Sequence, residues 1–199
     1  MSDSAKDSQE LDLIRSIGHD PRAMYRLYRE HALGLYRFAL ALTGEPQAAE
    51  DAVQESMIAA WRDPSAFDGR SRVSTWLLGI CRHKVLDALR RANRARNIEK
   101  RAASKMTSMI SESQLPGRGG ASPDVSARIE FWEAFGRLPL NQREVLLLVF
   151  HFGLSQDEAS SVLGIPVGAV RSRVYRARTR LAALLENGTG NLPGEELLG

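Results

Sequence analysis

The sequence predicts an all-α protein made of two small helical domains joined by a flexible linker. Apolar residues recur at helical spacing, whereas alternating runs typical of strands are scarce, and only 7% of the 199 residues are aromatic. This apolar periodicity fades between residues 97 and 123, where the run SESQLPGRGGASPD has a linker composition. A hydrophobic content of 43% is enough for a core on each side of that linker.

The first domain is expected to begin with two helices. Asp20-Pro21 is typical of a helix start and Gly44 of a helix end. The apolar face of this helix is formed by Met24, Leu27, Tyr28, Leu35, Phe38 and Leu42. Glu45-Pro46 opens the second helix, whose core-facing residues are expected to be Ala49, Val53, Met57 and Trp61. Residues 1–19 form an N-terminal extension, and we expect residues 1–10 to be disordered.

A third helix is expected to follow the loop RDPSAFDGRSR, starting near Val73 or Ser74 and continuing past Arg91. Its inner face would hold Leu77, Cys81, Val85 and Ala88. Cys81 is the only cysteine, which excludes an internal disulfide and a thiolate metal site. We expect it to be a small buried apolar residue.

The second domain is expected to begin with a helix capped by Ser122-Pro123 and marked by Ile129, Trp132, Phe135 and Leu138. Asn141 and Glu144 have the spacing of a capping box and would open the apolar helix REVLLLVFHF, which Gly153 ends.

Residues 154–185 have the pattern of a helix-turn-helix. Ser155 and Glu158 form a capping box, and Gly164-Ile165-Pro166 forces a turn. The helix after the turn carries five arginines and no acidic residue as far as Leu185. Two short helices joined by a tight turn, with the second one basic, are typical of a DNA-binding motif.

The helix after the turn has two distinct faces. Val170, Val174, Ala177 and Leu181 fall on one stripe and should point inward. The opposite stripe holds Ser172, Tyr175, Arg176 and Thr179, flanked by Arg171 and Arg178 on one side and by Arg173 and Arg180 on the other. This arrangement suits a helix in a major groove, where the central hydrogen-bonding groups would meet base edges and the flanking guanidinium groups would meet phosphates. The alternative is a solvated basic helix.

Charge is unevenly distributed, although the net charge is only +3. Residues 82–105 hold nine Lys or Arg, and residues 159–185 hold no acid. Two separate basic tracts indicate two contacts with a polyanion. The polar N-terminus lacks the apolar core of a signal peptide, and no stretch approaches the length of a membrane span. We therefore expect a cytoplasmic protein without membrane insertion.

Two other classes of function are alternatives to this two-domain, DNA-binding interpretation. A helix-turn-helix regulator that binds DNA alone would fit the second domain, but the first domain resembles neither a ligand pocket nor a dimerisation coil. An enzyme is disfavoured because Gly-rich phosphate loops and the GxSxG and HExxH motifs are absent from the sequence. The four histidines lack the spacing of metal ligands, so no metal or cofactor is expected.

Four sequence blocks resemble bacterial sigma factors of the sigma-70 family, in the short extracytoplasmic-function (ECF) group. The blocks are LYREHALGLYRFALALTG, AEDAVQESMIAAWRD, FDGRSRVSTWLLGICRHKVLDALRR and LPLNQREVLLLVFHFGLSQDEASSVLGIPVGAVRSRVYRARTRL. The resemblance implies a region 2 domain at 20–96, a linker at 97–123, a region 4 domain at 124–187 and a tail at 188–199. It implies a polymerase specificity subunit, not a catalyst.

The resemblance also implies partners and site residues. The partners are promoter DNA, core RNA polymerase through the coiled coil of its largest subunit and its flap, and an anti-sigma factor. The −10 element would be melted and read by Arg70, Ser71, Arg72, Ser74, Thr75, Trp76, Arg82, His83 and Lys84. The −35 duplex would be contacted by Arg171, Ser172, Arg173, Tyr175, Arg176 and Arg178. Polymerase would dock on Asp51, Gln54, Glu55 and Trp61.

Three of these assignments carry alternatives. Trp76 can stack on an unpaired base or fill the core. Many relatives have Asn at the position of His83, beside the pocket for a flipped −10 base, so the base preference of this chain is open. The acidic docking stripe, judged on charge alone, would be an ordinary solvated face.

Overall fold

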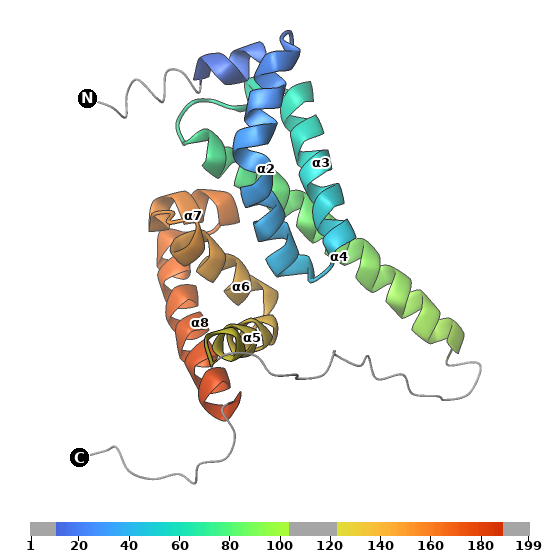
Figure 1. Cartoon of the computed structure of the whole chain (residues 1–199), viewed down its shortest axis with the longest axis vertical. Coiled ribbons are helices and arrows are strands. Elements are labelled where there is room, and N and C mark those ends of the chain that lie inside the picture. The colour runs from blue at the N-terminus through green and yellow to red at the C-terminus, as the bar shows by residue number, and fades with distance from the viewer. Residues whose placement is uncertain (1–10, 104–122, 189–199) are drawn as a thin grey trace.

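The computed structural model describes residues 11–103 and 123–188, and within these two ranges every regular element is helical. The first range holds a short helix over residues 11–16, followed by α2 (Pro21–Thr43) and α3 (Pro46–Arg62). A single 3₁₀ turn, η1 (Pro64–Ala66), leads to the long helix α4 (Val73–Ala103). Figure 1 shows α2, α3 and α4 side by side, with the far end of α4 projecting beyond its neighbours. The predicted all-α fold is confirmed.

The ends of α2 follow the predicted signals. The Asp20 carboxylate accepts a hydrogen bond from the Arg22 N–H at 2.8 Å, which satisfies a donor that the helix itself cannot pair. Gly44 ends the helix in the left-handed region at φ 72°, a conformation in which a glycine avoids the cost of a Cβ.

The core of the first domain includes a segment that the sequence pattern did not reveal. Leu13, Ile14 and Ile17 are buried against the three-helix bundle, with Ile14 and Ile17 each 1% exposed. Their three- and four-residue spacing is a helical signal that the polar start of the chain obscures. The same N-terminal helix touches the loop before α4, because a Cβ on Gly69 would lie 2.8 Å from Leu11 Cδ2.

Two local predictions were wrong. Tyr28 and Trp61, expected in the core, are 51% and 50% exposed. Asn141 does not cap the next helix, whose N-cap is Pro139 without a side-chain hydrogen bond. The helix α4 continues past Arg91, as predicted, and its end at Ala103 overlaps the first residues of the predicted linker.

The second domain consists of α5 (Pro123–Gly136), α6 (Leu140–Leu146), a π-helical turn η2 (Leu147–His151), α7 (Gln156–Leu163) and α8 (Val167–Gly188). Its core lies where α5, α6 and α7 meet α8, and Val145, Leu148 and Val170 are fully buried there. The cap Ser122, the remaining predicted linker and the tail from residue 189 lie outside the described residues.

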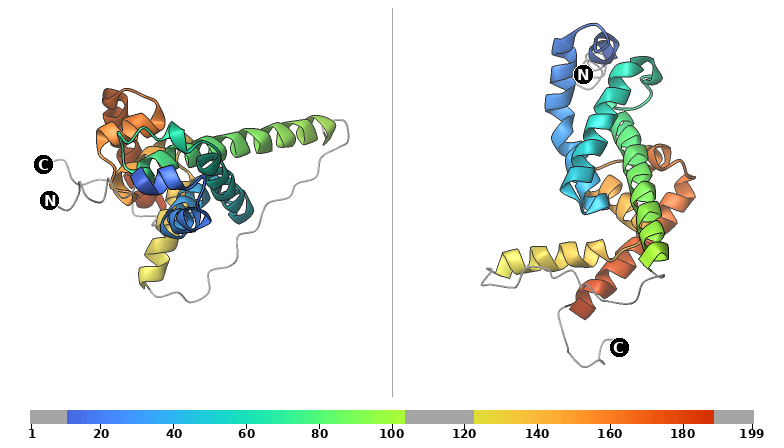
Figure 2. Two further views of the ribbon diagram at one scale, coloured as in Figure 1. Left: turned by 90° about the horizontal axis from the view of Figure 1, so that it is seen from above. Right: turned by 90° about the vertical axis from the view of Figure 1, so that its right-hand side faces the viewer.

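The two domains pack against each other. In the chain, α4 contacts α7 and α2 contacts α6, and both views of Figure 2 show the two groups of helices in contact. Phe38 of α2 meets Phe152, at the end of η2, edge to face at 5.8 Å between ring centroids. The hydrophobic cores of both domains form one continuous cluster.

Cys81 is expected to resist thiol reagents in the folded protein. It is fully buried, and burial raises the pKa of its thiol to about 12, while a hydrogen bond with Ser56 opposes the shift. Because the thiolate is the reactive form, a chromogenic disulfide should find almost no free thiol at pH 8 until the chain is unfolded. The exposed control variant Gln47→Cys should contribute one rapidly reacting thiol. Rapid reaction of native Cys81 would contradict its buried position.

Candidate nucleic-acid interface

The turn between α7 and α8 has the geometry of the predicted helix-turn-helix. The Ser155 hydroxyl accepts from the Glu158 N–H at 3.2 Å, and the Glu158 carboxylate accepts from the Ser155 N–H at 2.8 Å. This capping box confirms the predicted start of α7. Gly164 ends α7 at φ 65°, and the Ser160 hydroxyl donates to the Ile165 carbonyl across the turn. The turn therefore fixes the direction in which α8 leaves.

The helix α8 presents a polar face to solvent. On its inner side Val170 and Ala177 are fully buried, and Val174 and Leu181 are half-buried against the core. On its outer side the most exposed aromatic residue is Tyr175, at 73%. Ser172, Arg176 and Thr179 are exposed on this side as well. The predicted division of the helix into two faces thus appears in the structure.

The arginines of α8 have different surroundings. Arg171 Nε donates to Gln156 Oε1 at 2.7 Å, which ties the basic helix to the helix before the turn. Arg176 Nε donates to the Ser172 carbonyl at 3.2 Å along the exposed face. Arg178 lies over the Phe150 ring at 5.8 Å from its centroid. Arg173 is half-buried, unlike the exposed arginines of this helix, and its positive charge partly opposes the burial that raises the pKa of Glu144.

A second group of predicted contact residues surrounds the start of α4. Arg70 is exposed and pairs with Asp68 at 3.5 Å, and His83, further along α4, is also exposed. Ser71 and Ser74 are half-buried. Trp76 is half-buried against the core, with its ring 5.2 Å from that of Phe67. In this conformation Trp76 therefore acts as a packing residue.

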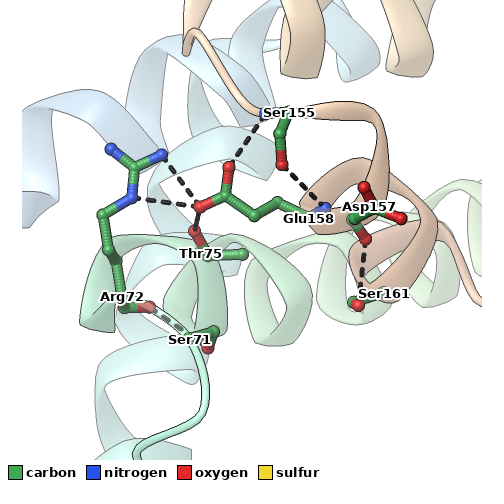
Figure 3. A network of polar contacts seen from close by, with 7 residues as sticks. All are labelled: Ser71, Arg72, Thr75, Ser155, Asp157, Glu158 and Ser161. Carbon is green, nitrogen blue, oxygen red and sulfur yellow. Dashed lines mark hydrogen bonds and ion pairs between the residues drawn. The ribbon is translucent and has the colours of Figure 1, made fainter.

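Arg72 and Thr75 contact the second domain. Arg72 donates from Nε at 3.1 Å and from Nη2 at 2.9 Å to Glu158 Oε1, and Thr75 Oγ1 lies 3.5 Å from the same oxygen (Figure 3). Burial raises the pKa of Glu158, but hydrogen bonds from Ser155 and the positive Arg72 together hold that pKa below its ordinary value. Glu158 is therefore a carboxylate that serves both the cap of α7 and the contact between domains.

Arg82 makes a second ionic contact with the second domain. Its Nε lies 3.0 Å from Glu144 Oε1, and its Nη2 donates to Glu144 Oε2 at 3.4 Å. The two side chains are only 14% and 3% exposed. Burial raises the pKa of Glu144, and the charges of Arg82, Arg173 and Arg143 partly oppose this shift. Glu144, predicted as a cap residue, is instead the buried partner of Arg82.

The predicted docking stripe on α3 is divided between two faces. Asp51 and Gln54 are exposed, whereas Glu55 faces α4, where it pairs with Lys84 at 3.5 Å and with Arg91 at 3.6 Å. Gln54 and Trp61 line an apolar groove whose other walls are Ile17, Gly18, His19, Pro21, Met24, Tyr28, Met57 and Ile58. The sequence did not point to Tyr28 and Ile58 as surface residues, because periodicity assigns the apolar side of each helix to the core.

The second domain has an apolar cavity of about 380 Å³ that the sequence did not predict. It lies where α5, α6, η2 and α8 meet, and its walls are Phe131, Trp132, Phe135, Leu146, Leu147, Phe150, His151, Arg178 and Leu181. Trp132 and Phe150 are 50% and 59% exposed, so a large aromatic surface faces solvent. The π-helical turn carries Phe150 and His151 to this surface.

Neither a metal site nor a membrane span is found among the described residues. In residues 11–103 and 123–188, His, Cys, Asp and Glu do not gather in groups of three that could bind a metal ion. Within the same ranges, every helix is too short or too polar to cross a bilayer.

Comparison with known proteins gives consistent matches to both domains. Residues 27–95 match the family model for sigma-70 region 2, and residues 128–181 match that for sigma-70, region 4. The chain is 34% identical over 164 residues to the ECF RNA polymerase sigma factor SigL of Mycobacterium tuberculosis, covering 82% of this chain and 89% of the relative. It is 30% identical over 184 residues to the RNA polymerase sigma factor CnrH of Cupriavidus metallidurans, covering 91% of this chain and 96% of the relative.

Two solved structures are also similar. One is the sigma factor RpoE in complex with the anti-sigma factor NepR from Bartonella quintana, with a TM-score of 0.62 and 28% identity over 81% of this chain and 96% of that chain. The other is CnrH in complex with the cytosolic domain of CnrY, with a TM-score of 0.62 and 28% identity over 89% of this chain and 97% of that chain.

Proposed function

Because the chain belongs to the sigma-70 family of RNA polymerase sigma factors, in its extracytoplasmic-function group, we propose which of its residues carry each step of promoter recognition. The chain binds core RNA polymerase and directs promoter-specific initiation of transcription. The observation that carries this function is the order of the two family regions, together with 34% identity over 89% of a sigma factor. It acts in the cytoplasm as a binding subunit, with no chemical step of its own.

The helix α8 reads the −35 element as a duplex. Arg171, Ser172, Tyr175 and Arg176 lie on or beside its exposed face, where base edges would meet hydrogen-bonding groups. Arg178 and Arg180 flank this face and contact phosphates, which fix register without reading sequence. Arg173 contributes through its charge at the edge of the interface, because its side chain is half-buried.

The start of α4 captures the −10 strand after it unpairs. Melting requires that unstacked bases find new partners, and a basic surface with aromatic rings supplies them. The proposed contact residues are Arg70, Ser71, Arg72, Ser74, Thr75, Arg82, His83 and Lys84, among which Arg70, Arg72 and His83 are exposed. Trp76 stays in the packed layer with Phe67, where it supports the helix that presents the other side chains.

Polymerase docks on two apolar surfaces. The groove containing Trp61 and Gln54 binds the coiled coil of the largest subunit. Asp51, exposed on the same helix three residues before Gln54, supplies a negative charge that suits a basic helical hairpin. The aromatic cavity around Trp132 and Phe150 binds the flap. An anti-sigma factor competes for these surfaces, since the similar sigma factor RpoE was solved with the anti-sigma factor NepR.

Reconstituted transcription tests this proposal. Core polymerase with the full chain should enrich, from a randomised promoter library, templates that share two short elements at fixed spacing. Trp61→Ala should weaken polymerase binding about tenfold or more, because it removes an exposed aromatic anchor of the kind that dominates interfaces. The matched control Tyr25→Ala, an aromatic residue 65% exposed outside the groove, should leave binding unchanged.

Two outcomes would contradict this proposal. A chain that confers no start-site selection on core polymerase, yet shifts free duplex DNA, would be a stand-alone helix-turn-helix regulator. Equal losses for Trp61→Ala and Tyr25→Ala would place the docking surface elsewhere on the domain.

A further inference from the structure

The contact between the two domains uses the side chains that the proposed function assigns to the −10 strand. Arg72 and Thr75 meet Glu158, and Arg82 meets Glu144. Thr75 is 2% exposed in this arrangement, and the Arg82 side chain is 14% exposed. These three proposed strand-contacting residues thus contact acidic side chains of the second domain.

We propose that this contact is autoinhibitory: the carboxylates of Glu144 and Glu158 occupy the guanidinium groups that would otherwise bind phosphates of the −10 strand. The free chain is then closed on itself and becomes competent for melting only when its domains separate. This inference rests on the proposed function, because it assumes that Arg72 and Arg82 contact DNA.

A carboxylate can take the place of a phosphate as the partner of an arginine. A carboxylate and a phosphate both offer a guanidinium group charged oxygen acceptors at similar distances. Arg72 donates from both Nε and Nη2 to a single oxygen, Glu158 Oε1, and Arg82 faces both oxygens of Glu144 (Figure 3 shows the first pair). Each arginine therefore already has an anionic partner in the closed form.

The contact has the features of a reversible one. The Arg72 and Glu158 side chains remain 52% and 26% exposed, so water competes for this pair and its stabilising effect is small. Arg82–Glu144 is buried, but both charges regain hydration when the domains part. Two further contacts join the domains. Phe38 packs against Phe152, and Arg143 donates a hydrogen bond to the Ala41 carbonyl at 3.3 Å. Binding of polymerase to separated domains can therefore shift the population.

The double variant E144Q/E158Q tests the closed form. Glutamine keeps the shape of both side chains, and a Gln at position 158 can still complete the capping box with Ser155. The control E133Q/D157N removes the same charge from the same domain at exposed positions, one of them on α7 itself. Neither pair removes a residue assigned to DNA or polymerase. Circular dichroism checks that each variant folds, and E158Q alone is the milder second variant.

Domain separation is measured on the free full chain by energy transfer between dyes at Gln47→Cys and Ala183→Cys, both exposed positions. Cys81 is buried with a raised thiol pKa, so it takes up little dye. We expect E144Q/E158Q to lower transfer efficiency, and E158Q alone to lower it less, while the control matches the parent chain. A 20-nucleotide random single strand should bind E144Q/E158Q about fivefold more tightly than the control.

The outcomes separate this inference from the function it rests on. Unchanged transfer and unchanged single-strand binding in E144Q/E158Q relative to the control would overturn autoinhibition, even if the chain directs transcription. Lowered transfer efficiency without tighter single-strand binding would also overturn autoinhibition, because separating the domains would then expose no group that binds DNA. If the domains open as expected but wild-type chain fails to direct transcription, the proposed sigma function falls while the closed contact stands.

Discussion

Replacing Leu77 by alanine is expected to lower the free energy of unfolding of the first domain by about 2–5 kcal/mol. Leu77 is fully buried at the inner face of α4, where α2 and α3 converge. The change removes apolar contacts and leaves a cavity that rigid helices cannot close. For a domain of this size such a loss corresponds to a fall in melting temperature of at least about 8 °C.

Thermal unfolding followed by circular dichroism and hydrogen exchange along α4 would measure this effect. The control is Leu33→Ala on α2, where the side chain is 59% exposed, and there we expect a change within about 0.5 kcal/mol. A Leu77→Ala chain as stable as the Leu33→Ala chain would mean that α4 does not form the core described here. Because α4 also carries residues that we propose contact the −10 strand, promoter melting should fail in parallel with folding.

Replacing Arg176 by alanine is expected to flatten the preference for one base of the −35 element by about 5- to 150-fold. The Arg176 guanidinium lies on the exposed face of α8, anchored only by its Nε hydrogen bond to the Ser172 carbonyl. A bidentate contact from such a group to guanine contributes about 1–3 kcal/mol of discrimination. Transcription from a library randomised at the −35 element, in the presence of core polymerase, measures the change position by position.

Arg180→Ala is the matched control for this experiment. Arg180 is exposed on the flank of the same helix and is assigned to phosphate. Its loss should weaken all promoters to a similar extent and reduce the dependence of binding on salt, without altering base preference. If Arg176→Ala and Arg180→Ala behave alike, α8 does not read bases through Arg176.

Local signals in the sequence predicted the helices well. Asp20-Pro21 and Gly44 set the ends of α2, and Ser155, Glu158 and Gly164 set those of α7, because caps and left-handed glycines act within one turn. The buried position of Cys81 followed from its place on an apolar stripe. The residues alone are therefore enough to recognise both domains and the family to which they belong.

Contacts between distant segments could not be predicted in the same way. The spacing of Glu144 after Asn141 suggested a local cap, but the carboxylate is used 62 residues away in sequence, by Arg82. Tyr28 and Trp61 are apolar residues at helical spacing, and both are exposed. Periodicity assigns such residues to the core, because it cannot distinguish a surface covered by the chain itself from one covered by a partner protein.

Leu11 lies close to Gly69, in the loop that leads to the segment we propose for promoter melting. Gly69 has φ 74°, and any larger residue would collide with Leu11 as well as strain the backbone. A truncation from the amino end that removes Leu11 would delete the side chain that packs against the loop before Arg70. Such a truncated form should lose strand opening before it loses polymerase binding, although every residue proposed to contact DNA would still be present.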